Sequence, residues 1–135
     1  MGQVKERASR NQTIDLTPDE EREYLKLCID ENDVAEGTKF IDRIVYGDCF
    51  SVLQNIPENS VDLLIVDPPY TSTFRKMDEL DYGDFTRKWI SSTLHTLKKT
   101  ASVYVCCDWK TSLIIGSVLC EYFTVQNRIT WQREK

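Results

Sequence analysis

The chain has 135 residues, 41% of them hydrophobic and 29% charged, with a net charge of −5 and an isoelectric point near 4.9. This length predicts one globular core, and no stretch approaches the roughly 18 apolar residues that a membrane span requires. Met1–Arg10 lacks the apolar centre of a secretion signal, so a cytoplasmic location is expected. The acidic balance disfavours tight binding of nucleic acid by this chain alone, because backbone affinity comes from Lys and Arg.

Residues 1–16 have a mixed polar composition without periodicity and are expected to form a flexible segment. The next four residues predict a helix start, with Thr17 as N-cap, Pro18 at the first helical position and Glu20 completing a capping box. This helix is expected to run to about Glu31 and to dock at the edge of the core. Residues 17–39 are thus a helix and linker that precede the main domain at 40–135.

The first half of the main domain is typical of a β-α-β unit. A strand, a short helix and a second strand, buried on both faces, are predicted at Phe40–Tyr46, Phe50–Gln54 and Val61–Val66. Parallel strands end at the same edge of a sheet, so Asp48 and Asp67 are expected to emerge together at the carboxyl edge, where α/β sheets bind ligands. Asp48 also has the position of an N-cap for the short helix.

The tetrapeptide Asp67-Pro68-Pro69-Tyr70 follows the second strand directly. Pro68 cannot donate to a strand ladder, and the two prolines together hold the backbone extended. The Asp67 carboxylate, the Pro68 carbonyl and the Tyr70 ring therefore form a row of two acceptors and a stacking face. This set suits a planar group that bears an NH2, because each acceptor takes one N–H and the nitrogen lone pair stays free to attack.

The second half of the domain continues the alternation of helices and strands. A polar surface loop that can move over the site is expected first, at Thr71–Gly83. A helix, a buried strand, a second helix and a closing strand are then predicted at Asp84–Lys99, Ala101–Cys107, Lys110–Tyr122 and Phe123–Trp131. The pattern predicts an α/β fold with a largely parallel, doubly wound sheet and flanking helices.

Cysteine and histidine residues give no pattern of a metal site or a disulfide framework. The five cysteines form an odd set without a C-x-x-C pair, and His95 is the only histidine. Buried free thiols are expected, and His95 is expected at the surface or in packing. Trp89 is expected in the core because it lies at helical spacing with apolar neighbours.

These motifs resemble the amino-methyltransferases that use S-adenosylmethionine to methylate the exocyclic nitrogen of adenine or cytosine in DNA. The resemblance lies in Asp67–Tyr70 after Leu63–Val66, preceded by Ile44–Cys49 and Leu53. It implies a partial Rossmann-like methyltransferase fold, in the permuted group in which the catalytic half comes first. In that group a glycine-rich cofactor loop and a target-recognition region come later, and neither lies within these 135 residues.

The resemblance also implies S-adenosyl-L-methionine as cofactor, double-stranded DNA as substrate, and a target base that is flipped out of the duplex. An Asp at the first position of the tetrapeptide resembles the adenine-N6 enzymes, whereas a Ser is more typical of cytosine-N4 enzymes. The implied roles are catalysis by Asp67, Pro68, Pro69 and Tyr70, cofactor binding by Asp48, Cys49 and Asp67, and target-base binding by Tyr70, Trp131 and Arg133.

Several alternatives stay open. The same site type serves cytosine-N4 methylation and methylation of RNA or of a glutamine side chain, although the early position of the catalytic strand favours DNA. The chain is otherwise a non-catalytic fragment or a split half that needs a partner chain. Trp131 is equally suited to packing at a sheet edge. A cognate restriction endonuclease and a homodimer are further partners that the sequence does not decide, and no metal or membrane partner is expected.

Overall fold

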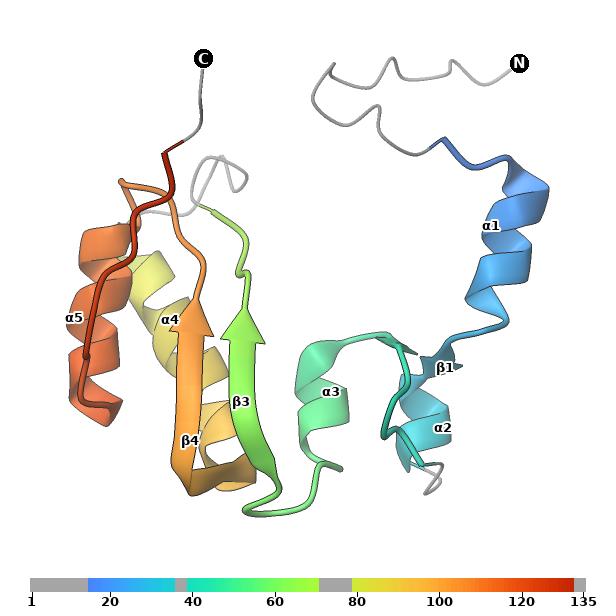
Figure 1. Cartoon of the computed structure of the whole chain (residues 1–135), viewed down its shortest axis with the longest axis horizontal. Coiled ribbons are helices and arrows are strands. Elements are labelled where there is room, and N and C mark those ends of the chain that lie inside the picture. The colour runs from blue at the N-terminus through green and yellow to red at the C-terminus, as the bar shows by residue number, and fades with distance from the viewer. Residues whose placement is uncertain (1–14, 36–38, 71–78, 133–135) are drawn as a thin grey trace. The chain divides into compact units, whose positions relative to one another are not determined.

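The computed structural model describes residues 15–35, 39–70 and 79–132, and the chain divides into two compact units, Met1–Val52 and Leu53–Lys135 (Figure 1). The first unit begins with helix α1 (Pro18–Leu25). Its predicted capping box is confirmed, because the Glu20 amide donates to Thr17 Oγ1 at 3.3 Å and the Thr17 amide donates to Glu20 Oε2 at 2.8 Å.

Helix α1 ends at Leu25, six residues before the predicted end. Strand β1 (Ile29–Asp30) and helix α2 (Glu31–Ala35) follow. The Asp30 carboxylate accepts hydrogen bonds from the Asn32 and Asp33 amides at 2.8 and 2.9 Å, so it caps a new helix where the old one was expected to continue. No residue of α1 is buried in the structure.

Strand β1 pairs in parallel with β2 (Val45–Tyr46), which is shorter than the predicted strand at Phe40–Tyr46. Helix α3 (Cys49–Leu53) follows within one residue of its predicted position. Apart from their capping hydrogen bonds, these short elements have few buried side chains to stabilise them. Among the described residues of this unit, Val34 is the buried apolar side chain.

The second unit is built on two parallel strands, β3 (Val61–Val66) and β4 (Leu97–Val105). The register places Leu63 beside Ser102 and Val66 beside Val105, and both strand arrows point the same way in Figure 1. The Cys106 amide donates to the Val66 carbonyl at 2.8 Å, so the pairing extends to the last residue before the tetrapeptide.

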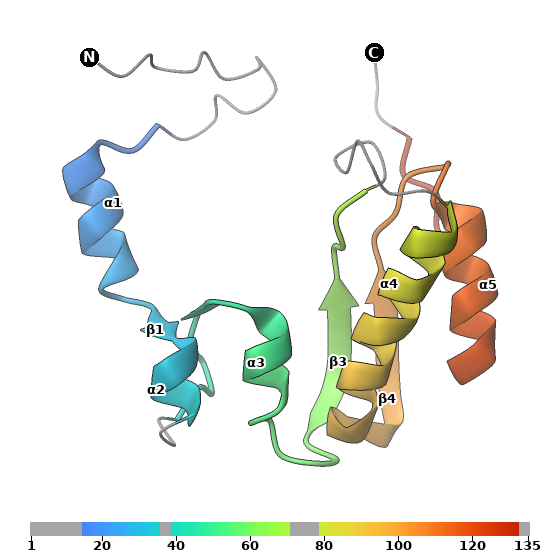
Figure 2. The ribbon, with the colours of Figure 1, turned by 180° about the vertical axis from the view of Figure 1, so that it is seen from behind.

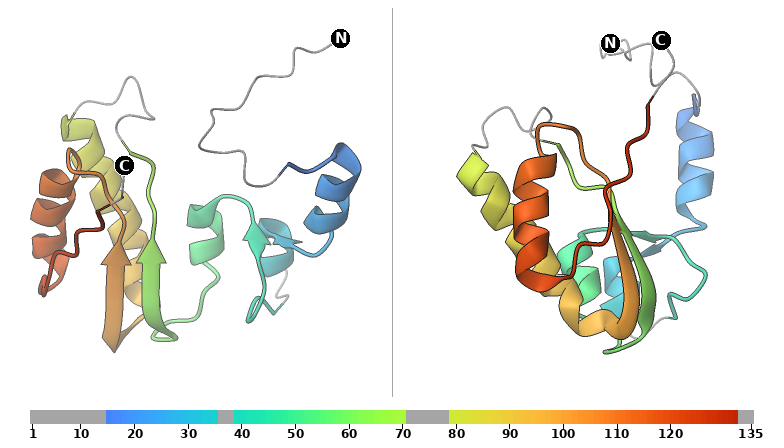
Figure 3. Two further views of the ribbon diagram at one scale, coloured as in Figure 1. Left: turned by 45° about the horizontal axis from the view of Figure 1, so that its top comes forward. Right: turned by 60° about the vertical axis from the view of Figure 1, so that its left-hand side comes forward.

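Helices α4 (Glu79–Thr93) and α5 (Ser112–Tyr122) cover one face of this strand pair (Figures 2 and 3). A 3₁₀ turn, η2 (Leu94–Thr96), leads from α4 into β4. The helix predicted at Asp84–Lys99 therefore begins earlier and ends earlier, because its last residues form the start of β4. The buried apolar side chains at this interface are Tyr82, Trp89, Ile90, Ile115 and Val118, which confirms the core position of Trp89.

The opposite face of the strand pair carries exposed apolar side chains. Leu63, Ile65 and Tyr104 are 52, 66 and 53% exposed, so the prediction that β3 is buried on both faces is wrong for the described residues. Strands β2 and β3 also belong to different sheets, which corrects the expected single β-α-β sheet. The α/β class with parallel strands and flanking helices is confirmed.

The segment after α5 has no strand in the described residues 124–132, which corrects the strand predicted at Phe123–Trp131. A strand requires a hydrogen-bonding neighbour, and here β3 and β4 pair with each other.

None of the described helices has the length and hydropathy needed to cross a membrane. The cysteines are free thiols, but they are exposed at 49, 106, 107 and 120 and half-buried at 28, so their predicted burial is wrong.

Candidate functional site

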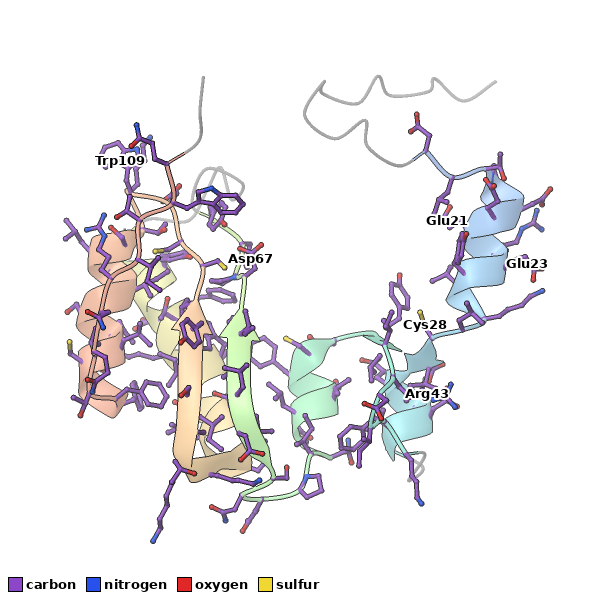
Figure 4. All side chains as sticks on the ribbon, in the orientation of Figure 1. Glu21, Glu23, Cys28, Arg43, Asp67 and Trp109 are labelled. Atoms are coloured by element: carbon purple, nitrogen blue, oxygen red, sulfur yellow. The ribbon has the colours of Figure 1, made fainter. Side chains whose placement is uncertain are left out.

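The tetrapeptide lies at the carboxyl edge of the β3–β4 pair. Figure 4 shows Asp67 just beyond the end of β3 and Trp109 beyond the end of β4, at the same end of the strands. Asp67 is exposed, Pro68 is buried and Tyr70 is half-buried. Burial of Pro68 thus fixes the backbone, while the Asp67 carboxylate faces solvent. A ligand can therefore reach this carboxylate as a hydrogen-bond acceptor.

The Tyr70 side chain folds back onto Asp67. Its hydroxyl donates a hydrogen bond to Asp67 Oδ1 at 2.8 Å. This bond is the main reason why the pKa of Tyr70 is raised to about 12, with burial and the Asp67 charge acting in the same direction. The structure therefore brings together the acceptor and the aromatic ring that the sequence predicted, and it shows that the carboxylate accepts a hydrogen bond.

A residue that the sequence analysis placed in a surface loop contacts the tetrapeptide. Tyr82 lies on α4 with its side chain fully buried, and its hydroxyl donates to the Pro69 carbonyl oxygen at 3.1 Å. The sequence pattern could have indicated this helical position. Tyr82 lies three residues before Phe85 and seven before Trp89, so it continues their apolar helical stripe toward the N-terminus. The remainder of the predicted loop, 71–78, lies outside the described residues.

The turn after β4 is held by its own hydrogen bonds. Asp108 Oδ1 accepts from the Thr111 amide and from Thr111 Oγ1, each at 2.8 Å. These bonds, with one from the Lys110 amide, lower the pKa of Asp108 against the opposing effect of burial, which is the largest single contribution. Partial desolvation of the thiol likewise raises the pKa of the neighbouring, largely exposed Cys107. A fixed, ionised Asp108 is expected at neutral pH.

The predicted cofactor residues Asp48 and Cys49 lie in the first unit, at the end of β2 and the start of α3. Asp48 Oδ2 accepts from the Ser51 amide at 3.0 Å and the Ser51 hydroxyl at 3.1 Å, so Asp48 is the N-cap of α3. The Asp48 amide donates to Glu31 Oε2 at 2.8 Å. A Cβ at Gly47 would approach the Glu31 side chain to 3.0 Å, so this contact favours glycine there.

The predicted target-base residues are at the end of the chain. Trp131 is 86% exposed, so it does not pack at a sheet edge. Arg133 lies outside the described residues. Trp109, which was given no role from sequence, is 76% exposed with the Lys110 ammonium 5.8 Å from its ring centre. No group of three or more potential metal ligands occurs in the described part of the chain.

Comparison with known proteins gives a consistent result. Residues 61–135, which hold the second unit from β3 onward, match the family of N6 and N4 methyltransferases described as DNA methylase. The chain is 26% identical over 115 residues to type II methyltransferase M.HinfI of Haemophilus influenzae, across 70% of this chain and 32% of that protein. It is 30% identical over 98 residues to type II methyltransferase M1.MboII of Moraxella bovis, across 69% and 38%. The chain spans about a third of the length of these relatives.

Proposed function

Because the chain belongs to the N6/N4 DNA methylase family, we propose that Asp67–Tyr70 holds the exocyclic amine of an adenine in duplex DNA while that amine is methylated at N6. The observation that carries the proposal is the Tyr70–Asp67 contact at the end of β3. It places an aromatic face beside a solvent-accessible carboxylate, so a base that stacks on the ring brings its amine to an acceptor.

The chain's own residues perform the orientation. Asp67 and the Pro68 carbonyl each accept one N–H of the amine, which directs the nitrogen lone pair away from both acceptors. S-adenosylmethionine supplies the methyl group as an electrophilic sulfonium when it is bound. Asp67 stabilises the positive charge that develops on nitrogen and then accepts a proton, and no covalent bond to the protein is needed.

The residues of this chain offer suitable partners for the adenosine part of this cofactor but not for its methionine part. Asp48 offers an exposed carboxylate after a parallel strand, which suits the N–H and hydroxyl donors of an adenosine group, and Cys49 follows it at the start of α3. In the sequence, Gly2, Gly37, Gly47, Gly83 and Gly116 lie far apart, so these 135 residues contain no glycine-rich turn for the methionine end. Asp48, Cys49 and Asp67 are therefore proposed as cofactor contacts, and Trp131 and Arg133 as target-base contacts.

The choice of adenine rests on Asp67 as the first residue of the tetrapeptide. The test uses a polypeptide that extends residues 1–135 to the length of the relatives, which we refer to as the extended enzyme. Duplex DNA is incubated with this protein and methyl-labelled cofactor, and the labelled nucleosides are separated by chromatography. Label in N6-methyladenine supports the proposal, whereas label in N4-methylcytosine would replace adenine by cytosine as the target.

A further inference from the structure

The tetrapeptide has few backbone N–H donors through which it can be held in place. Pro68 and Pro69 carry no N–H, so neither of these residues can be held by donating a backbone hydrogen bond. The segment must therefore be fixed through its carbonyl groups, its side chains or its packing. Of these, the Pro69 carbonyl has a defined partner, the hydroxyl of Tyr82 at 3.1 Å.

Tyr82 is well placed to act as a fixed donor. Its side chain is fully buried on α4, the helix that covers the strand pair, and two turns of that helix beyond it pack through Trp89 and Ile90. Burial and the nearby charge of Asp108 raise the pKa of Tyr82, and a hydrogen bond with the Thr111 side chain opposes them. The phenol therefore stays protonated at neutral pH and donates to Pro69.

The same side chain also lies against the turn after β4. Thr111 is fully buried and contacts Tyr82, and Asp108 holds Thr111 through the two hydrogen bonds at its carboxylate. The buried phenol thus lies between the loops that follow two neighbouring parallel strands. A shift of the tetrapeptide would have to break the Tyr82–Pro69 hydrogen bond, and a rearrangement of the turn after β4 would have to break the Asp108–Thr111 bonds. Breaking such bonds in a largely buried interface is costly.

We propose that Tyr82 is a positioning residue, whose hydroxyl fixes the Pro69 carbonyl and thereby sets the orientation of the Pro68 carbonyl and the Tyr70 ring toward the target amine. This inference rests on the proposed function for its catalytic consequence. Its structural content, a hydrogen bond that holds the tetrapeptide in one conformation, stands independently and is tested on residues 1–135 themselves.

The structural test is nuclear magnetic resonance of the labelled chain. The triple-resonance peak of the Tyr70 amide reports the carbonyl carbon of Pro69. Tyr82→Phe keeps the ring and removes the donor, so the Pro69 carbonyl resonance should move upfield and the Tyr70 amide should gain fast motion. The control is Tyr122→Phe, which removes a hydroxyl that lies 3.5 Å from Ser91 Oγ between α5 and α4, away from the tetrapeptide.

An unchanged Pro69 resonance in a folded Tyr82→Phe chain, or an equal change in Tyr122→Phe, would overturn the inference. Should Tyr82→Phe fail to fold, 3-fluorotyrosine at residue 82 replaces it. This analogue keeps the ring and is a stronger donor, so the Pro69 resonance should move in the opposite direction. No movement with the analogue would equally refute the hydrogen bond.

The catalytic consequence is tested in the extended enzyme. Tyr82→Phe should lower the single-turnover rate of methyl transfer by roughly 10- to 100-fold, the range for a displaced reacting group, with little change in KM for the cofactor. In an Asp67→Ala background, Tyr82→Phe should add almost no further loss, because its effect passes through the same site. A wild-type rate in Tyr82→Phe with an impaired Asp67→Ala rejects the positioning role alone, whereas a wild-type rate in Asp67→Ala rejects the proposed function.

Discussion

Asp67 and Tyr70 form the smallest unit of the site with a defined geometry. The hydrogen bond between them keeps the ring close to the carboxylate, and the two prolines limit how far the backbone can move. A target amine has to share or replace the contact that the Tyr70 hydroxyl makes with Asp67 Oδ1. The ring and the hydroxyl of Tyr70 therefore have separable effects on the reaction.

Asp67→Ala is expected to reduce methyl transfer by the extended enzyme by more than about 100-fold, the scale for removal of one preorganised polar group at a reacting centre. Cofactor affinity should fall far less than the rate, because Asp67 is one of three proposed cofactor contacts but is the proposed side-chain acceptor for the amine. Single-turnover rates and calorimetry measure the two quantities. The matched control is Asp62→Ala, which removes an exposed carboxylate from β3 that pairs with Lys98 at 2.6 Å. Equal losses in both variants would contradict the role of Asp67.

Tyr70→Ala should weaken capture of the target base, since stacking on an aromatic face contributes about 1–3 kcal/mol per base. Tyr70→Phe keeps that face, so its loss should be much smaller. Binding of DNA and single-turnover methylation by the two variants separate the effects. If Phe is as damaging as Ala, the hydroxyl rather than the ring carries the function, and the stacking role is wrong.

The Tyr70–Asp67 hydrogen bond also predicts a raised pKa for Tyr70, which a titration can measure. Absorbance should show a tyrosine of residues 1–135 that ionises at about 12, above its ordinary value of 10.0. Asp67→Asn should return it toward that value, which distinguishes Tyr70 from Tyr82, whose pKa is raised by burial. The bond requires the protonated phenol, so its contribution to stability is complete below pH 10.0 and is lost as the pH rises to about 12. Identical titration curves for the two proteins would contradict the contact.

At the scale of elements, the β3–β4 pair and the two helices on its face form the part of the molecule that positions the site. The carboxyl ends of both strands lead into the loops between which Tyr82 lies. The helices are linked by Arg87 of α4, whose guanidinium donates to both carboxylate oxygens of Glu121 at 2.7 and 3.0 Å. This pair is exposed, so packing rather than charge is expected to dominate the stability of the interface.

Ile90→Ala should therefore lower the free energy of unfolding by about 2–5 kcal/mol, because Ile90 is fully buried at the centre of the helix–sheet interface. Leu113→Ala on α5 is the control, with a side chain that is 77% exposed and an expected change within about 0.5 kcal/mol. Urea denaturation of residues 1–135 and its variants measures both. Comparable losses at the two positions would show that α4 does not pack as described.

At the scale of the whole molecule, the second unit holds the tetrapeptide and one helical layer, while the other face of its strands is apolar and exposed. Strands β3 and β4 pair only with each other among the described residues, so the outer edges of this pair have unpaired backbone groups. A surface of this kind favours self-association. This chain spans about a third of the length of its relatives.

Residues 1–135 by themselves are expected to transfer no methyl group to duplex DNA. They should bind S-adenosylmethionine no more tightly than roughly millimolar, the range in which a few contacts barely offset the cost of association. Label transfer and calorimetry test the two statements, with the extended enzyme as the positive control. Micromolar affinity or any turnover would show that the cofactor contacts proposed at Asp48 and Cys49 are incomplete or misplaced.

Much of the fold and of the site follows from local sequence. The capping box at Thr17, the β3 strand with its proline stop and the helical stripe around Trp89 are determined by side-chain chemistry within a few residues, and all three are observed. The tetrapeptide, too, predicts its acceptor and its ring from the residues alone. Local rules suffice here because capping, proline geometry and amphipathic spacing act over one or two helical turns.

Tertiary structure decided the remainder. The change from helix to strand at Leu97 and the absence of a strand in 124–132 depend on which partner a segment finds, since backbone groups in a strand must pair with a neighbour. The hydrogen bond from Tyr82 to Pro69 spans 13 residues and depends on α4 packing against the strand pair. No local pattern contains such a contact, because the energy that fixes it comes from burial shared between elements.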